Sequence, residues 1–182
     1  MSGIPTQIGV AFFYGDNFSI ESAIVLSSGI QFDDTVLCGT LAETVDGWAA
    51  YWRECPPNSP LCERYLSLMG IIKVATVGRS LMDVYNFIVM QDKATRDEIA
   101  RANRRNRNGP GAGPKPFDYV HRVLSYLCNT GFINLPFTVR TNLDAYIAQR
   151  LENLKAVQAA RHGLYPIISL EGNEDTIYGQ IN

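Results

Sequence analysis

Apolar residues recur at intervals of three and four along most of the chain, which is the spacing of an amphipathic α-helix. Breaks divide this pattern into separate helices. Cys55-Pro56-Pro57 ends the first, and Asn129-Thr130-Gly131 ends the fourth, with Gly131 as the residue after the helix. The expected helices are 37–52, 59–72, 79–89, 117–128 and 141–162. The pattern therefore predicts a mainly α protein with a compact core of about five helices.

The two ends of the chain lack this helical spacing. In residues 1–35, short apolar runs alternate with the turn signals Gly15-Asp16-Asn17 and Ser27-Ser28-Gly29, which favours extended or irregular structure. The aromatic residues here either fold back on the chain's own core or insert into a neighbouring subunit, and both remain open. We therefore expect an N-terminal arm over 1–35, a helical core over 36–162 and an extended C-terminal tail over 163–182, with arm and tail linking subunits.

Composition places the chain among globular proteins of one domain, since hydrophobic residues make up 46% and charged residues 19% of its 182 residues. Its apolar stretches are too short to cross a bilayer, and no signal-type block follows the start, so neither a membrane protein nor a secreted one is expected. The four cysteines include no Cys-x-x-Cys pair, and the chain has two histidines. Free buried thiols in a reducing compartment are therefore expected, with no metal site and no cofactor.

The charged residues are strongly segregated along the chain, although the net charge is only −2. Residues 1–52 contain six acids and no Lys or Arg, whereas residues 93–161 contain twelve bases and five acids. Eight of the sixteen bases lie within 93–122, which we call the basic stretch. Arginine dominates it, and a planar guanidinium donates paired hydrogen bonds to phosphate while staying charged. The basic stretch is therefore the expected contact surface for nucleic acid.

The candidate contacts to nucleic acid are arginines and a lysine in and around the basic stretch. A glycine-rich segment adjoins them at 109–113, and its backbone amides can approach a phosphate closely. Two other interpretations stay open for these side chains: a solvated surface loop, and pairing with the acidic arm of a neighbouring subunit. The candidate residues are Arg104, Arg105, Arg107 and Lys115 first, then Arg79, Arg101, Arg122 and Arg140.

The sequence does not predict an enzyme. His121 lies one helical turn from Asp118, and Ser125 shares that face, but such spacing is common by chance on a helix. A half-buried helical histidine is the simpler interpretation. The glycine-rich segment also lacks the lysine and the strand–helix setting of a phosphate-binding loop. No catalytic group of residues is therefore assigned.

Two short motifs resemble those of the coat proteins of flexible filamentous plant viruses. The first is the aromatic–Asp–aromatic run Phe117-Asp118-Tyr119, and the second is Gly131-Phe-Ile-Asn-Leu-Pro136, followed by a helix over 143–160. The resemblance covers residues 79–160. It implies a helical core in which Asp118 forms an ion pair with an arginine, here Arg79. It also implies subunits linked by their arms, with single-stranded RNA held in a basic groove.

The resemblance and the basic stretch together predict a viral coat protein or nucleoprotein that assembles into a helical filament and encapsidates single-stranded RNA, with DNA still open. Such a protein is expected in the virion, and in the host cytoplasm during assembly. Binding would come mainly from Arg and Lys contacts to phosphate and would depend little on base sequence. The alternative is a protein-only assembly subunit, a sheath or scaffold, whose basic stretch docks an acidic arm of a neighbour.

Overall fold

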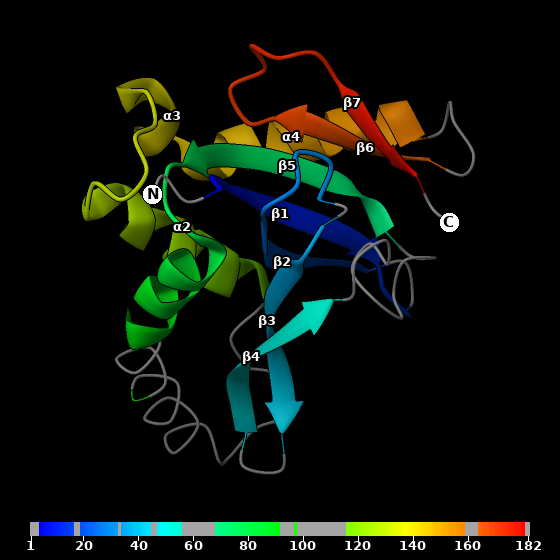
Figure 1. The fold of residues 1–182 in the computed structure, drawn as a ribbon. Coiled ribbons are helices and arrows are strands. Elements are labelled where there is room, and N and C mark those ends of the chain that lie inside the picture. The colour runs from blue at the N-terminus through cyan, green and yellow to red at the C-terminus, as the bar shows by residue number, and fades with distance from the viewer. Residues whose placement is uncertain are drawn as a thin grey trace.

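The computed structural model describes residues 4–16, 19–32, 34–44, 47–55, 68–91, 97, 116–158 and 164–180. Within them the protein is a mixed α/β fold built on one seven-stranded sheet (Figure 1). The strands are β1 (Thr6–Tyr14), β2 (Ile20–Ser27), β3 (Val36–Thr44), β4 (Gly47–Cys55), β5 (Leu68–Val77), β6 (Leu164–Ser169) and β7 (Ile177–Gln180). The helical segments are residues 81–91, α2 (Pro116–Asn129), α3 (Phe137–Thr141) and α4 (Leu143–Gln158). The prediction of a mainly α protein with five helices was wrong.

The strands lie in the order β4-β3-β2-β1-β5-β6-β7. Neighbouring strands are antiparallel except for β5 and β6, which run parallel. A parallel pair needs a long crossover connection, and here the helices α2, α3 and α4 lie within that connection. Along the chain, the helical segments therefore lie between β5 and β6. In space, α2 and α4 pack against the sheet and do not form a separate core.

The expected N-terminal arm and C-terminal tail are parts of this sheet. β1 lies at its centre, bonded to β2 on one side and to β5 on the other. Both faces of β1 are buried from Thr6 to Phe13, so its apolar residues form a continuous run without the alternation that marks a half-exposed strand. The tail forms β6 and β7 at the other side of β5. Neither segment is an extended arm.

The helix expected over 37–52 is the hairpin of β3 and β4, in which Thr44 pairs with Gly47. Residues four apart share a face in a strand, where the side-chain period is 2, and also nearly share one in a helix, where it is about 3.6. Leu37 and Leu41 show this ambiguity, since both belong to one buried cluster on one face of β3. The spacing of these apolar residues was therefore compatible with either structure.

Two apolar clusters lie on opposite faces of the sheet. The larger one packs beneath the helices, with α2 against β2 and β3 and α4 against β5 and β6 (Figure 1). The smaller one includes Phe13, Val25 and Ile167. The loop after β2 covers it by inserting Phe32, which is fully buried. The Tyr165 hydroxyl donates a hydrogen bond to the Gln31 carbonyl oxygen at 2.8 Å and so fixes this loop to β6.

Three cysteines lie among the described residues, Cys38, Cys55 and Cys128, and all three are buried. Burial raises the pKa of the Cys128 thiol, and the positive charge of Arg140 opposes this shift to a smaller extent. A raised pKa leaves less thiolate at any pH below it, and the thiolate is the reactive form. Cys128 is therefore expected to be chemically inert in the folded protein.

We expect iodoacetamide at about pH 8 to leave Cys128 unmodified in the native protein and to modify it rapidly after unfolding in guanidinium. Mass mapping of the peptide that contains Cys128 measures both rates. Equal rates in the native and unfolded samples would show that this thiol is neither buried nor raised in pKa.

No helix among the described residues is both long and apolar enough to span a bilayer.

Candidate nucleic-acid interface

A cleft opens where β5 and β6 end. Because these two strands are parallel, their carboxyl ends meet at the same edge of the sheet, the usual place for a ligand in sheets with parallel strands. The cleft has a volume of about 540 Å³. Its walls come from the end of β5, from the loop 131–135 after α2, and from the loop after β6. Its polar lining residues include Lys73, Thr76, Arg79, Asn134, Ser169, Glu171, Asn173 and Glu174.

The loop after β6 is held in place by hydrogen bonds at both sides. From α4, Arg150 donates through Nε to the Leu170 carbonyl oxygen at 3.0 Å and through a terminal nitrogen to the Glu171 carbonyl oxygen at 3.1 Å. The Leu170 N–H donates to the Lys73 carbonyl oxygen at 2.8 Å and so continues the pairing of β5 with β6. Because its backbone is fixed, the loop presents its side chains to the cleft in a defined arrangement.

Charges of both signs lie in the cleft. Lys73 Nζ donates to Glu174 Oε2 at 2.8 Å, and the Lys73 side chain is the more buried of the two. Arg79 and Glu171 add one further charge of each sign. The cleft is therefore not a purely positive site of the kind that binds phosphate. It offers both hydrogen-bond donors and acceptors to a ligand.

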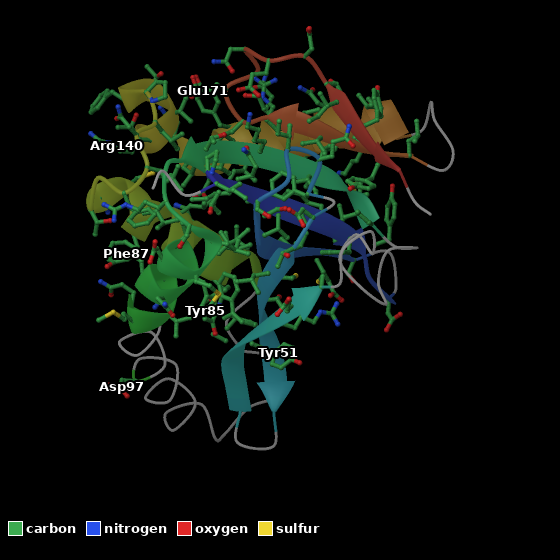
Figure 2. All side chains as sticks on the ribbon, in the orientation of Figure 1. Tyr51, Tyr85, Phe87, Asp97, Arg140 and Glu171 are labelled. Carbon is green, nitrogen blue, oxygen red and sulfur yellow. The ribbon has the colours of Figure 1, made fainter. Side chains whose placement is uncertain are left out.

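One wall of the cleft continues into a stack of aromatic rings, which we call the aromatic ladder. The ring of Phe132 lies against the ring of Phe87, with centroids 4.2 Å apart and planes at 21°. Phe87 in turn stacks on Tyr126, with centroids 5.3 Å apart and planes at 24°. The guanidinium carbon of Arg79 lies 5.2 Å from the centroid of Phe132 and extends the ladder into the cleft. Figure 2 labels Phe87, which belongs to the helical residues 81–91.

The end of α2 places Phe132 in this position. Gly131 takes the left-handed conformation, with φ at 68°, and follows the helix as the sequence predicted. The N–H groups of Gly131 and Phe132 then donate to carbonyl oxygens of the last helical turn, those of Cys128 and Leu127. This cap turns the chain sharply and directs Phe132 toward Phe87.

A second pair of arginine and phenylalanine lies on α3. The guanidinium carbon of Arg140 is 5.7 Å from the centroid of the Phe137 ring, which is 70% exposed. Arg140 and Glu171 lie toward the same end of the molecule, where β5 and β6 end (Figure 2). This end therefore carries an exposed ring, Phe137, and a half-buried ring, Phe132, each with a guanidinium beside it.

The structure brings only part of the predicted set of residues to this end. Arg79 and Arg140 are exposed and contact the rings just described. Arg122 is exposed on α2. The other predicted contacts lie outside the described residues, and these are Arg101, Arg104, Arg105, Arg107 and Lys115.

The ion pair expected between Asp118 and Arg79 stays a prediction. The structure places the Arg79 guanidinium over the Phe132 ring. His121 approaches Asp144 of α4, with Nε2 and Oδ1 3.4 Å apart. The rings of the ladder were not predicted, because Phe87, Tyr126 and Phe132 come from three segments that only the folded chain brings together.

The chain matches none of the family models, curated proteins or solved structures with which it was compared. Within the part of the chain that the structure describes, no cluster of three His, Cys, Asp or Glu residues is placed to hold a metal ion. The geometry of the cleft and of the ladder is therefore the basis for a functional proposal.

Proposed function

We propose that the protein binds single-stranded nucleic acid, RNA in the first place, at the end of the molecule where the cleft and the aromatic ladder meet. The observation that carries this proposal is the position of the Arg79 guanidinium, over Phe132 and inside the cleft. Single-stranded chains expose the faces of their bases, and proteins bind them by stacking those bases on aromatic rings or on guanidinium planes. Arg79 offers such a plane together with a positive charge for phosphate.

Arg140 and Phe137 support the same proposal. Phe137 is a large apolar side chain left mostly in water, and its neighbour Arg140 keeps a cation on its ring. An exposed ring beside a guanidinium gives a second stacking position without any need for a deep pocket. The arginines of the basic stretch would add contacts to phosphate along the strand.

The surface through which copies of the protein would assemble is not assigned. A viral coat protein or nucleoprotein remains the setting in which we propose that this binding operates. β1 and β2, and β6 and β7, pair within the chain's own sheet. The proposed binding therefore does not depend on these strands linking one subunit to another.

Substitution of Arg79 tests the proposal. With a fluorescent single-stranded RNA of about 12 nucleotides, we expect Arg79→Ala to raise Kd about tenfold, since a stacked base contributes about 1–3 kcal/mol. The same variant should reduce the slope of log K against log salt by about 0.7, because one phosphate contact is lost. Arg79→Lys keeps the charge but not the plane, so it should weaken binding while leaving the salt slope unchanged. Fluorescence anisotropy across a salt series measures both quantities.

Lys155→Ala is the matched control, since Lys155 lies on α4 and is paired there with Glu152 outside the cleft. It removes the same charge and should leave Kd within about twofold. Wild-type protein that binds no RNA, or Arg79 variants that bind as tightly as the control, would exclude the proposed function. The ratio of absorbance at 260 and 280 nm of the protein purified from cells gives an independent measurement, since a protein-only subunit would carry no nucleic acid.

A further inference from the structure

The cleft contains an ordered relay of hydrogen bonds that ends on a carboxylate. Ser169 Oγ donates to Asn173 Oδ1 at 3.0 Å, and Asn173 Nδ2 donates to Glu171 Oε2 at 3.4 Å. Both donors point along the relay toward Glu171, so this carboxylate is the terminal acceptor. An ionised carboxylate has about four positions that accept hydrogen bonds. The relay occupies one of them at a long distance, which leaves capacity to accept from a ligand.

Glu171 differs in this respect from the other carboxylate of the cleft. Glu174 already accepts a short hydrogen bond from the ammonium group of Lys73, and this bond balances its charge. Glu171 has a half-buried side chain, and Arg150 reaches its backbone oxygen rather than its carboxylate. Its backbone is therefore fixed while its negative charge remains available to donors that enter the cleft.

The donors that a nucleic acid can bring to such a carboxylate are the N–H groups of its bases. Guanine alone presents two N–H groups side by side on its Watson–Crick edge, which match the two oxygens of a carboxylate. Adenine and cytosine each place one amino group next to an acceptor nitrogen, and uracil places one N–H between two carbonyl oxygens. A carboxylate in the cleft would therefore attract guanine and repel part of the edge of each other base.

We infer that the cleft receives one base of the bound strand and selects guanine through the Glu171 carboxylate, an inference that rests on the proposed binding of single-stranded nucleic acid. Arg79 lines the same cleft and lies over Phe132, so its guanidinium plane supplies the stacking surface and its charge the phosphate contact that bring a base edge to Glu171. The other proposed contacts to the strand, to phosphate and by stacking, would not depend on base sequence. Selection of guanine would occur only at the position in the cleft.

The test compares strands that differ at one base. The probes are fluorescent RNA strands of about 12 uridines. The central position is occupied by guanosine, inosine, adenosine or uridine. For wild-type protein we expect the guanosine strand to bind about tenfold more tightly than the uridine and adenosine strands, as a bidentate contact to a base allows. Inosine lacks the 2-amino group and should fall between them. Glu171→Gln should abolish the preference, because an amide offers one acceptor and one donor in place of two acceptors.

Glu152→Gln is the matched control, since Glu152 is exposed on α4 and pairs with Lys155. It removes the same negative charge outside the cleft, so any general gain in affinity for RNA should appear in both variants while the preference for guanosine persists in the control. Melting temperatures equal to that of the wild type establish that both variants are folded.

Four outcomes would overturn the inference. Equal affinity of wild-type protein for all four strands would remove the selection but leave the proposed function standing. No binding to any strand would remove both. A guanosine preference that survives in Glu171→Gln would assign the selection to another group. If an arginine-rich peptide bound the wild type and lost its affinity in Glu171→Gln, while all four strands bound equally, the cleft would be a protein-docking site.

Discussion

Replacing Gly70 with alanine is expected to destabilise the protein by about 3 kcal/mol or more, because the change adds both backbone strain and a steric clash. Gly70 lies in β5 with φ at +157°, a conformation that residues with a side chain rarely adopt. A Cβ at this position would lie 2.7 Å from the carbonyl oxygen of Pro166 in β6 and 2.7 Å from a methyl carbon of Leu154 in α4. The Pro166 oxygen is a backbone atom of the neighbouring strand and cannot rotate away.

Two other glycines separate these two causes. A Cβ at Gly78 would meet nothing within 4 Å, so Gly78→Ala should change the free energy of unfolding by about 0.5 kcal/mol or less. A Cβ at Gly131 would also meet nothing within 4 Å, but its left-handed backbone should make alanine cost about 1 kcal/mol. Equilibrium unfolding in urea, monitored by tryptophan fluorescence, measures all three. Equal stability of the Gly70→Ala and Gly78→Ala proteins would refute the close approach of β5, β6 and α4.

Removing two arginines of the basic stretch is expected to have the largest effect on binding. Arg104 and Arg105 lie outside the described residues, so this prediction rests on the sequence. In the variant with Arg104→Ala and Arg105→Ala, Kd for single-stranded RNA should rise about thirtyfold at low salt, because two charge-assisted contacts to phosphate are lost. The slope of log K against log salt should fall by about 1.4, which is about 0.7 for each contact on a single strand.

The corresponding double lysine variant shows whether charge or geometry matters at these two positions. Lysine keeps the charge, so the salt slope should return to that of the wild type, while affinity recovers only in part because the paired donors are missing. Anisotropy titrations at several salt concentrations measure slope and affinity together. If the alanine variant binds RNA with the affinity and the slope of the wild type, the basic stretch does not contact phosphate.

The spacing of apolar residues predicted three helices correctly and two wrongly, since the helix expected over 37–52 is the hairpin of β3 and β4 and the one expected over 59–72 runs into β5, which begins at Leu68. The helices expected over 79–89, 117–128 and 141–162 correspond to helical residues 81–91, α2 and α4. Each of them buries apolar residues in the larger cluster and exposes other residues to water, which places apolar residues at helical intervals. Strands β1 and β5 are buried on both faces over most of their length, so no alternation of polar and apolar residues reveals them.

Charge identified the arginines of the candidate site, but not what surrounds them. Arg79 and Arg140 were predicted because they flank the basic stretch, and both lie at the proposed interface. Their ring partners Phe132 and Phe137 resemble ordinary core residues in the sequence. Glu171 could not be singled out, because its role depends on a loop that Arg150 holds from a different element. Contacts between distant segments decide these roles, and a linear pattern does not contain them.

The parallel pairing of β5 with β6 also affects how the molecule reaches its folded form. Lys73 and Leu170 meet across almost a hundred residues of chain, so their hydrogen bond can form only after that whole length has been ordered or looped out. Closing so long a loop costs entropy before any contact repays it, which makes such pairings slow. During synthesis, the strands before β6 can pair with one another while the cleft still lacks one wall. The wall of the cleft that carries Glu171 is therefore added after the walls that carry Arg79 and Phe132, and the proposed selection of guanine becomes possible only once β6 has joined the sheet.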